Sequence, residues 1–231
     1  MRSDADIAIL RHCLSKTRVR WIQFDGRFFL EDSAIANALT QDEVERAADR
    51  QIAVLNSAVQ LKCGHFEKLD LRCIIEFQER GTSRAGVGII RRVLSQRAAY
   101  EVRAFLDNDQ SNIDEILNAS DADEEFGNAL HFLNRGENPW TDLYKCFEVI
   151  RSANGGEDKL TEPGWCSKRQ LKRFRWTANH PLASGKQARH ARLGTAAPTD
   201  PMSIEQAHEF ILELLRYWGK NISKATTAHL R

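Results

Sequence analysis

The sequence has no run of about 18 consecutive apolar residues, the length that a membrane-spanning helix needs. Its N-terminal segment also lacks the apolar centre and the small-residue cleavage site of a secretory signal peptide. The five cysteines are widely spaced and form no Cys-x-x-Cys pair, which favours reduced thiols. Together these absences predict a cytoplasmic protein that has no membrane partner.

Motifs that cradle phosphate are missing as well. The chain has neither Gly-x-Gly-x-x-Gly nor Gly-x-x-x-x-Gly-Lys-Ser/Thr, and Ser184 lacks the flanking glycines of a Gly-x-Ser-x-Gly nucleophile turn. Cys63, His65 and Cys73 offer three candidate zinc ligands, but no fourth ligand stands at the spacing of known zinc modules. We therefore expect no cofactor and no metal site.

Charge is balanced overall and segregated along the chain. The 231 residues are 42% hydrophobic and 28% charged, with a formal net charge of +1, which suits one large domain or two small ones. An acidic block over 101–142 holds eleven carboxylates, whereas a basic block over 163–192 holds eight basic residues and no carboxylate. Either the two blocks pair within the fold or across a dimer, or the basic block is a local phosphate-binding surface.

The first half of the chain mixes helix and strand signals. Apolar residues at helical spacing predict two helices, over 4–15 and over 41–62. Thr40 and Glu43 open the second helix as a capping box. Runs of branched and aromatic residues predict strands, namely a hairpin over 21–30 around Asp25-Gly26 and two strands over 69–78 and 86–94. Segment 97–106 either continues this sheet or begins the helical half.

Beyond residue 110 the pattern is helical. Five runs have apolar residues at helical spacing: 111–118, 121–134, 139–152, 167–178 and 203–218. We therefore predict an α+β protein. Its expected parts are an N-terminal domain over 1–110 with a small antiparallel sheet and a long helix, a C-terminal α-helical bundle over 111–219, and a flexible tail over 220–231.

The basic block contains residues suited to RNA chemistry. Cleaving RNA without a metal needs a base for the 2′-hydroxyl, an acid for the leaving 5′-oxygen and positive charge beside the phosphorus. His180 and His190 are candidates for the acid and the base. Arg175 and Arg189 are candidate phosphate clamps, because guanidinium grips phosphate through two parallel hydrogen bonds.

A nucleic-acid surface would use the basic and aromatic residues of the same block. The expected members are Lys168, Arg169, Lys172, Arg173, Trp176, Arg189, His190 and Arg192. Trp176 would stack on a base. Structural roles are the alternative: His180 would cap a helix, His190 would form a hydrogen bond within a loop, and Trp176 would pack into the core.

The string from Arg175 to His180 has the form R-x4-H and resembles the signature of the HEPN superfamily of small helical bundles. Segment 138–218, which includes this string, also resembles the helical C-terminal part of uncharacterised bacterial proteins, so the resemblance covers about a third of the chain. It implies a metal-independent endoribonuclease or RNA-binding protein of a bacterial toxin–antitoxin or antiphage-defence system. Arg175 and His180 would be its catalytic pair, at the cleft of a homodimer.

An interaction protein is the alternative function. Its helical bundle would dimerise or dock a protein partner, and the N-terminal part would act as a sensor or adaptor. A solvent-open basic cleft that holds Arg175 and His180 together would favour the enzyme. Pairing of Arg175 with a carboxylate of 107–142, together with burial of His180, would favour the interaction protein.

Overall fold

The computed structural model describes residues 19–24, 27–31, 35, 40–63, 69–79, 82–91, 113–135, 139–188, 196 and 198–229. For the four strands the backbone alone is described. The helix expected over 4–15 and the segment 97–106 lie outside the described residues. The chain divides into two compact units, Met1–Leu117 and Asn118–Arg231.

Helices dominate the part of the chain whose side chains are described. Of those residues 83% are helical, and none of them lies in a strand. The expected α+β class is therefore wrong, and the fold is mainly helical. The physical reason is that nearly every buried side chain of the described core belongs to a helix or to a turn between helices.

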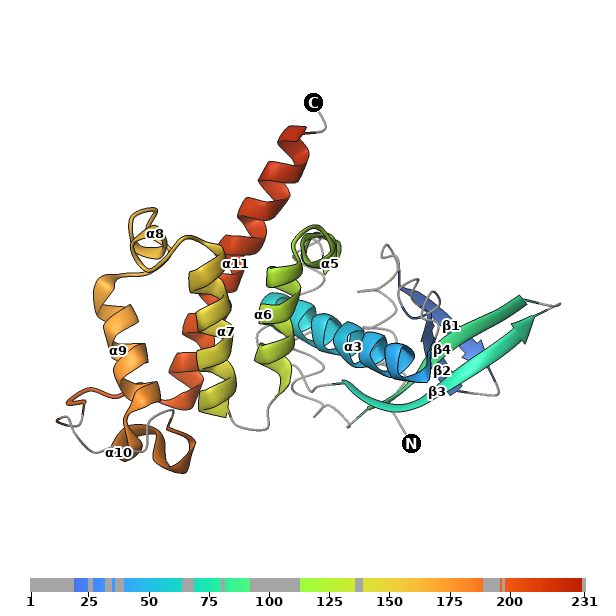
Figure 1. The fold of residues 1–231 in the computed structure, drawn as a ribbon, viewed down its shortest axis with the longest axis horizontal. Coiled ribbons are helices and arrows are strands. Elements are labelled where there is room, and N and C mark those ends of the chain that lie inside the picture. Colours follow the sequence, from blue (N-terminus) through green and yellow to red (C-terminus); the bar gives the residue numbers. More distant parts are fainter. Residues whose placement is uncertain are drawn as a thin grey trace. The chain divides into compact units, whose positions relative to one another are not determined.

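The N-terminal unit contains four strands, drawn in blue and green in Figure 1: β1 (Arg20–Phe24), β2 (Arg27–Glu31), β3 (Leu69–Glu79) and β4 (Thr82–Arg91). They pair antiparallel in the order β1-β2-β4-β3. A register shift between Leu71 and Cys73 interrupts the ladder of β3 with β4. Such a shift bends a strand and increases its local twist.

The long helix of this unit is α3 (Gln41–Cys63), which contacts β3. Its start confirms the expected capping box, because the amide of Thr40 donates to Oε2 of Glu43 at 3.0 Å and the amide of Glu43 donates to Oγ1 of Thr40 at 3.3 Å. All residues from 51 to 59 are buried. The middle of α3 is therefore buried all around, not along one amphipathic stripe.

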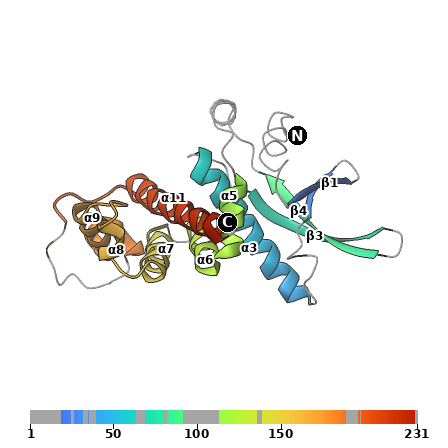
Figure 2. The same ribbon diagram turned by 90° about the horizontal axis from the view of Figure 1, so that it is seen from above.

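The C-terminal unit is a bundle of helices, and α5 (Ile113–Ala122) spans the boundary between the units. Its members are α6 (Glu124–Arg135), α7 (Pro139–Ala153), α8 (Asp158–Thr161), α9 (Lys168–Asn179), α10 (Pro181–Ser184), the 3-10 turn η1 (Gly185–Gln187) and α11 (Ile204–His229). Helix α7 packs against α6, α9 and α11 (Figure 1). Figure 2 shows α11 running past α7 and α6.

Aromatic rings hold α7, α9 and α11 together. Phe174 of α9 lies at the centre, with its ring centroid 5.4 Å from that of Phe147 on α7 and 5.3 Å from that of Phe210 on α11. Tyr144 stacks on the same ring at 6.1 Å. Because Phe174 is fully buried, this contact fixes one face of α9 in the core and turns the opposite face to solvent.

Helix α11 continues through His229, where the sequence predicted a flexible tail over 220–231. Gly219 lies within this helix. A methyl group at this position would lie 3.1 Å from Cζ of Phe126 on α6. The glycine therefore permits a close approach of two helices and does not end one.

None of the described helices is both long enough and apolar enough to cross a membrane.

Candidate functional site

Helix α9 has a capped start and a sharp end. Its N-cap is Ser167, whose Oγ accepts from the amide of Gln170 at 3.1 Å, while the amide of Ser167 donates to Oε1 of Gln170 at 2.9 Å. The helix ends at Asn179, and Pro181 begins α10 two residues later. This confirms the helix expected over 167–178 and fixes the direction in which each basic side chain leaves it.

Four residues of α9 are buried against the bundle: Leu171, Phe174, Thr177 and Ala178. The exposed side chains include three of the predicted nucleic-acid-binding cations, Lys168, Arg169 and Lys172. None of these three forms an ion pair with a carboxylate of the described residues. The exposed face of α9 therefore carries positive charge that the described part of the fold does not neutralise.

Arg173 has a structural role. Its guanidinium donates to the backbone oxygen of Asp200 at 2.9 Å, to Oδ1 of Asp200 at 3.0 Å and to Oε1 of Gln206 at 3.0 Å. It also donates to the backbone oxygen of Pro201 at 3.2 Å. These bonds connect α9 to the start of α11. The guanidinium of Arg173 is therefore not available to bind a nucleic acid.

Arg175 pairs with a carboxylate as well. Its Nη1 lies 2.8 Å from each carboxylate oxygen of Glu157, and Arg151 approaches the same carboxylate at 3.7 Å. The Nε of Arg175 is buried and has no hydrogen-bond partner. Glu157 and Asp200, the carboxylates that pair with Arg175 and Arg173, both lie outside the acidic block 101–142.

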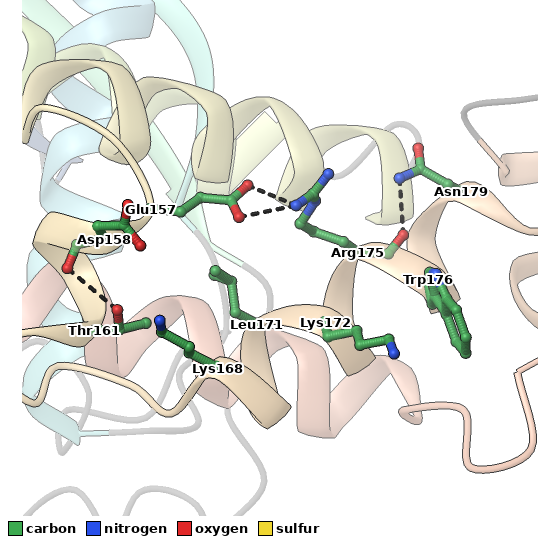
Figure 3. A pocket seen from close by; sticks show the side chains of 9 residues that line it. All are labelled: Glu157, Asp158, Thr161, Lys168, Leu171, Lys172, Arg175, Trp176 and Asn179. Carbon is green, nitrogen blue, oxygen red and sulfur yellow. Dashed lines mark hydrogen bonds and ion pairs between the residues drawn. The ribbon is translucent and has the colours of Figure 1, made fainter.

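A pocket of about 290 Å³ lies between α8 and α9, and Figure 3 shows its lining. The residues that line it are Glu157, Asp158, Thr161, Lys168, Leu171, Lys172, Arg175, Trp176 and Asn179. Glu157, Asp158 and Thr161 lie at one end, and Trp176 and Asn179 lie at the other (Figure 3). One wall is thus acidic and the wall formed by α9 is basic, with an aromatic ring at its far end.

Trp176 is the exposed aromatic side chain of this pocket. It is 54% exposed, and Nζ of Lys172 lies over its ring at 4.5 Å from the centroid. This is a cation–π contact between two side chains that lie one helical turn apart on α9. The alternative that Trp176 packs into the core is therefore wrong, and its indole ring is accessible to a flat ligand.

His180 does not share the pocket with Arg175. The imidazole is only 5% exposed, and its Nδ1 accepts from the amide of Leu182 at 3.3 Å, which caps the start of α10. A histidine that is buried in this way and absent from the pocket lining does not reach a ligand in the pocket. The structure therefore separates the two residues of the R-x4-H string, one beside Glu157 and one in the core.

The remaining predicted residues, Arg189, His190 and Arg192, lie outside the described residues. So do the side chains of Cys63 and Cys73 and the whole of His65. Within the described ranges, no group of three His, Cys, Asp or Glu side chains could hold a metal ion.

Sequence reasoning missed the acidic wall of the pocket. Glu157 and Asp158 follow Gly155 and Gly156, whose φ angles of 79° and 105° turn the chain sharply after α7. Such angles favour glycine because the Cβ atom of any other residue would clash with its own backbone. The Gly-Gly pair directly before two carboxylates is the sequence signal from which this turn could have been found.

The chain has no match among protein-family models, curated proteins or solved structures. The resemblance to HEPN proteins therefore stays a prediction based on the residues between Arg175 and His180.

Proposed function

We propose that the C-terminal unit binds single-stranded RNA along the exposed face of α9. The observation that carries the proposal is Trp176, an indole ring 54% exposed at the edge of a pocket, with the ammonium of Lys172 over its face at 4.5 Å. Proteins that bind single strands combine aromatic rings, on which bases stack, with cations that follow the phosphates.

The spacing of the side chains supports this mode of binding. Lys168, Lys172 and Trp176 are four residues apart and so lie on one face of α9. Helical rise places the first about 12 Å from the last, a length that accommodates roughly two nucleotides of an extended strand. A strand along this face would meet cations first and then the ring.

Arg175 and His180 have no catalytic role in this mode of binding. An acid or base must come within hydrogen-bond distance of the proton that it moves, and His180 is 5% exposed with Nδ1 already occupied. The positive charge of Arg175 is offset by Glu157 at 2.8 Å. These contacts favour the RNA-binding half of the expected function over the RNA-cleaving half.

Fluorescence anisotropy with a labelled mixed-sequence oligoribonucleotide tests the proposal. Trp176→Ala removes the stacking ring and should weaken binding by about 5- to 100-fold, the range for one lost base–aromatic contact. Lys172→Gln should lower the slope of log affinity against log salt by about 0.7, because one phosphate contact is lost.

The control for charge is Lys220→Gln, which removes an exposed lysine from α11. It changes the net charge of the protein as Lys172→Gln does, so unchanged affinity in this variant localises binding to α9. Equal losses in the two lysine variants would mean that only general attraction operates. Unchanged affinity in Trp176→Ala would rule out stacking on this ring.

A protein-docking role is the second candidate, and one observation favours it. Leu182 of α10 is 72% exposed, more than any other large apolar side chain of the described residues. If this residue contacts a second copy of the chain, sedimentation velocity should show a dimer that Leu182→Asp converts to a monomer. A monomer at all concentrations would remove this candidate.

A further inference from the structure

The α8 wall of the pocket is a poor place for phosphate. Asp158 lies there beside Glu157 and Thr161, opposite the start of α9 (Figure 3). Two neighbouring carboxylates repel an anion, whereas they accept hydrogen bonds well from hydroxyl groups. A ligand that fits the whole pocket must therefore present an anion and a flat ring to α9 and a hydroxyl donor to α8.

The carboxylates of Asp158 and Glu157 differ in whether their oxygens already have partners. Both oxygens of Glu157 are engaged by Arg175 at 2.8 Å. The carboxylate of Asp158 is exposed and makes no hydrogen bond or ion pair with any described residue, since Thr161 donates to its backbone oxygen and not to its side chain. Asp158 is thus the acceptor that the acidic wall leaves available to a ligand.

We infer that the pocket between α8 and α9 selects RNA over DNA, with Asp158 accepting a hydrogen bond from a ribose 2′-hydroxyl. The inference rests on the proposed function and specifies which sugar that site takes. One base stacks on Trp176, and a nucleotide roughly two positions along the strand, about 12 Å along the helix, places its ribose at the end where Lys168 and Asp158 lie.

The opposing charges explain how a carboxylate can serve in a site for an anionic strand. Lys168 lies on the α9 wall at the same end of the pocket and takes the phosphate, while Asp158 on the α8 wall takes the sugar. A deoxyribose strand has no hydroxyl to donate. With DNA bound, Asp158 would lose water without gaining a partner, and its charge would only repel the backbone.

The test compares two labelled oligonucleotides of one sequence, a ribonucleotide strand and a deoxyribonucleotide strand that carries uracil in place of thymine. Wild-type protein should bind the RNA about tenfold more tightly than the DNA, the effect of one charge-assisted hydrogen bond. Asp158→Ala should bring the two affinities together, mainly by weakening RNA binding. Asp158→Asn, which retains a weaker acceptor and removes the repulsion, should strengthen DNA binding.

The control variant is Glu213→Gln, which removes an exposed carboxylate from α11 and should leave the ratio of the two affinities unchanged. Thermal unfolding of each variant, followed by circular dichroism, shows whether it is folded at the assay temperature. A strand of 2′-O-methyl nucleotides provides a second measurement that needs no variant. It cannot donate from the 2′-oxygen, so it should bind wild-type protein no better than DNA does.

The outcomes separate this inference from the proposed function. Equal binding of RNA and DNA by wild-type protein, with both lost in Trp176→Ala, would overturn the role of Asp158 and retain the binding face of α9. A preference for RNA that survives in Asp158→Ala would also overturn it. Absence of binding to either strand would overturn the proposed function itself, and the inference with it.

Discussion

Nη1 of Arg175 lies 2.8 Å from both carboxylate oxygens of Glu157, a residue 18 positions earlier in the chain. The guanidinium that the sequence assigns to a phosphate is therefore already paired with an anion of its own chain. Because Arg151 shares that carboxylate at 3.7 Å, two arginines depend on Glu157 for their partner. The pair holds Arg175 at the pocket and reduces its attraction for a bound strand.

Glu157→Gln should therefore strengthen RNA binding by several-fold. The substitution leaves the positive charge of Arg175 without its anion, so the slope of log affinity against log salt should rise in magnitude by about 0.7. Anisotropy titrations from about 50 to about 200 mM salt measure both effects. The pair is partly exposed, and its loss should change the free energy of unfolding by less than about 1 kcal/mol.

Glu209→Gln is the matched control for this change, because Glu209 pairs with Arg216 on α11 at 2.7 Å. It removes the same charge and breaks a similar ion pair away from the pocket. Affinity that rises equally in both variants would show a general charge effect. Affinity that does not rise in Glu157→Gln would show that Arg175 is outside the binding surface.

Substitutions of His180 should separate a capping role from a catalytic one. His180→Ala removes the acceptor for the amide of Leu182 and should lower the free energy of unfolding by about 1–3 kcal/mol. Asparagine is a favourable N-cap residue, so His180→Asn should retain more of the stability. Chemical denaturation measures the difference between the two variants.

The same two variants also test the resemblance to metal-independent ribonucleases. Neither variant has an imidazole, so both would lose any RNA cleavage that depends on His180. Incubating labelled RNA with folded wild-type protein in EDTA should leave the RNA intact. Cleavage by wild-type protein that disappears in folded His180→Asn and in Arg175→Ala would contradict the structural role that we assign to His180.

Thr177 should be needed for the contact between α9 and the segment before α11. It is fully buried, its Oγ1 accepts from the amide of Met202 at 3.0 Å, and it donates to the backbone oxygen of Arg173 at 2.9 Å. Thr177→Val preserves the shape and leaves a buried amide without a partner, which should cost about 1–3 kcal/mol in urea denaturation.

The control is Thr226→Val on α11. Thr226 donates to the backbone oxygen of Ile222 at 3.0 Å, but it is exposed, so water can replace the lost bond. Its substitution should change the free energy of unfolding by about 0.5 kcal/mol or less. Similar effects of the two valine variants would show that the bond to Met202 adds nothing to stability.

Local signals predicted the helices of the C-terminal unit well. The two residues of each cap are only three positions apart, as at the start of α11, where the amide of Gln206 donates to Oγ of Ser203 at 3.2 Å. The starts of α9 and α11 lie close to where the periodicity of apolar residues places them. These features depend on interactions within a few residues, which a sequence displays directly.

The site was only half predictable, because its other half depends on contacts distant in sequence. Trp176 and Lys172 could be found from the basic block, whereas the pairing of Glu157 with Arg175 spans 18 residues and a turn through Gly155 and Gly156. The burial of His180 likewise follows from packing and not from its neighbours in the chain. A short motif such as R-x4-H therefore fixes residue types without fixing which of them reach solvent.

The thiols of α7 and of the turn before α9 should make the fold sensitive to alkaline pH. Burial raises the pKa of the Cys146 thiol, and burial followed by the charge of Glu157 raises the pKa of Cys166 from 9.0 to about 11. Unfolding releases both thiols to their ordinary range, so the unfolded state loses protons first. Their contribution to stability is complete below pH 9.0 and falls as the pH rises toward about 11.

Urea denaturation between about pH 8 and about pH 10 in the presence of a reductant measures this dependence, and Cys146→Ala isolates one thiol. The variant is less stable near neutral pH because it leaves a cavity, but its stability should fall less steeply with pH than that of the wild type. Parallel curves for the two proteins would show that Cys146 ionises equally in both states, in conflict with its complete burial.

Gly219→Ala tests the close approach of α11 to α6. In an exposed helix this change stabilises by up to about 1 kcal/mol, because alanine restricts the unfolded chain and favours the helix. Here the added methyl group would lie 3.1 Å from Cζ of Phe126, whose ring is fully buried and packs edge-on against Trp218 at 5.2 Å. Moving a ring that is fully buried and packed in this way disturbs its other contacts, so the substitution should destabilise by about 1–3 kcal/mol.

Phe126→Leu in the same chain should reduce that penalty, and urea denaturation of the two single variants and the double variant gives the coupling energy. Stabilisation by Gly219→Ala alone would instead mean that α11 can shift away from α6 at little cost.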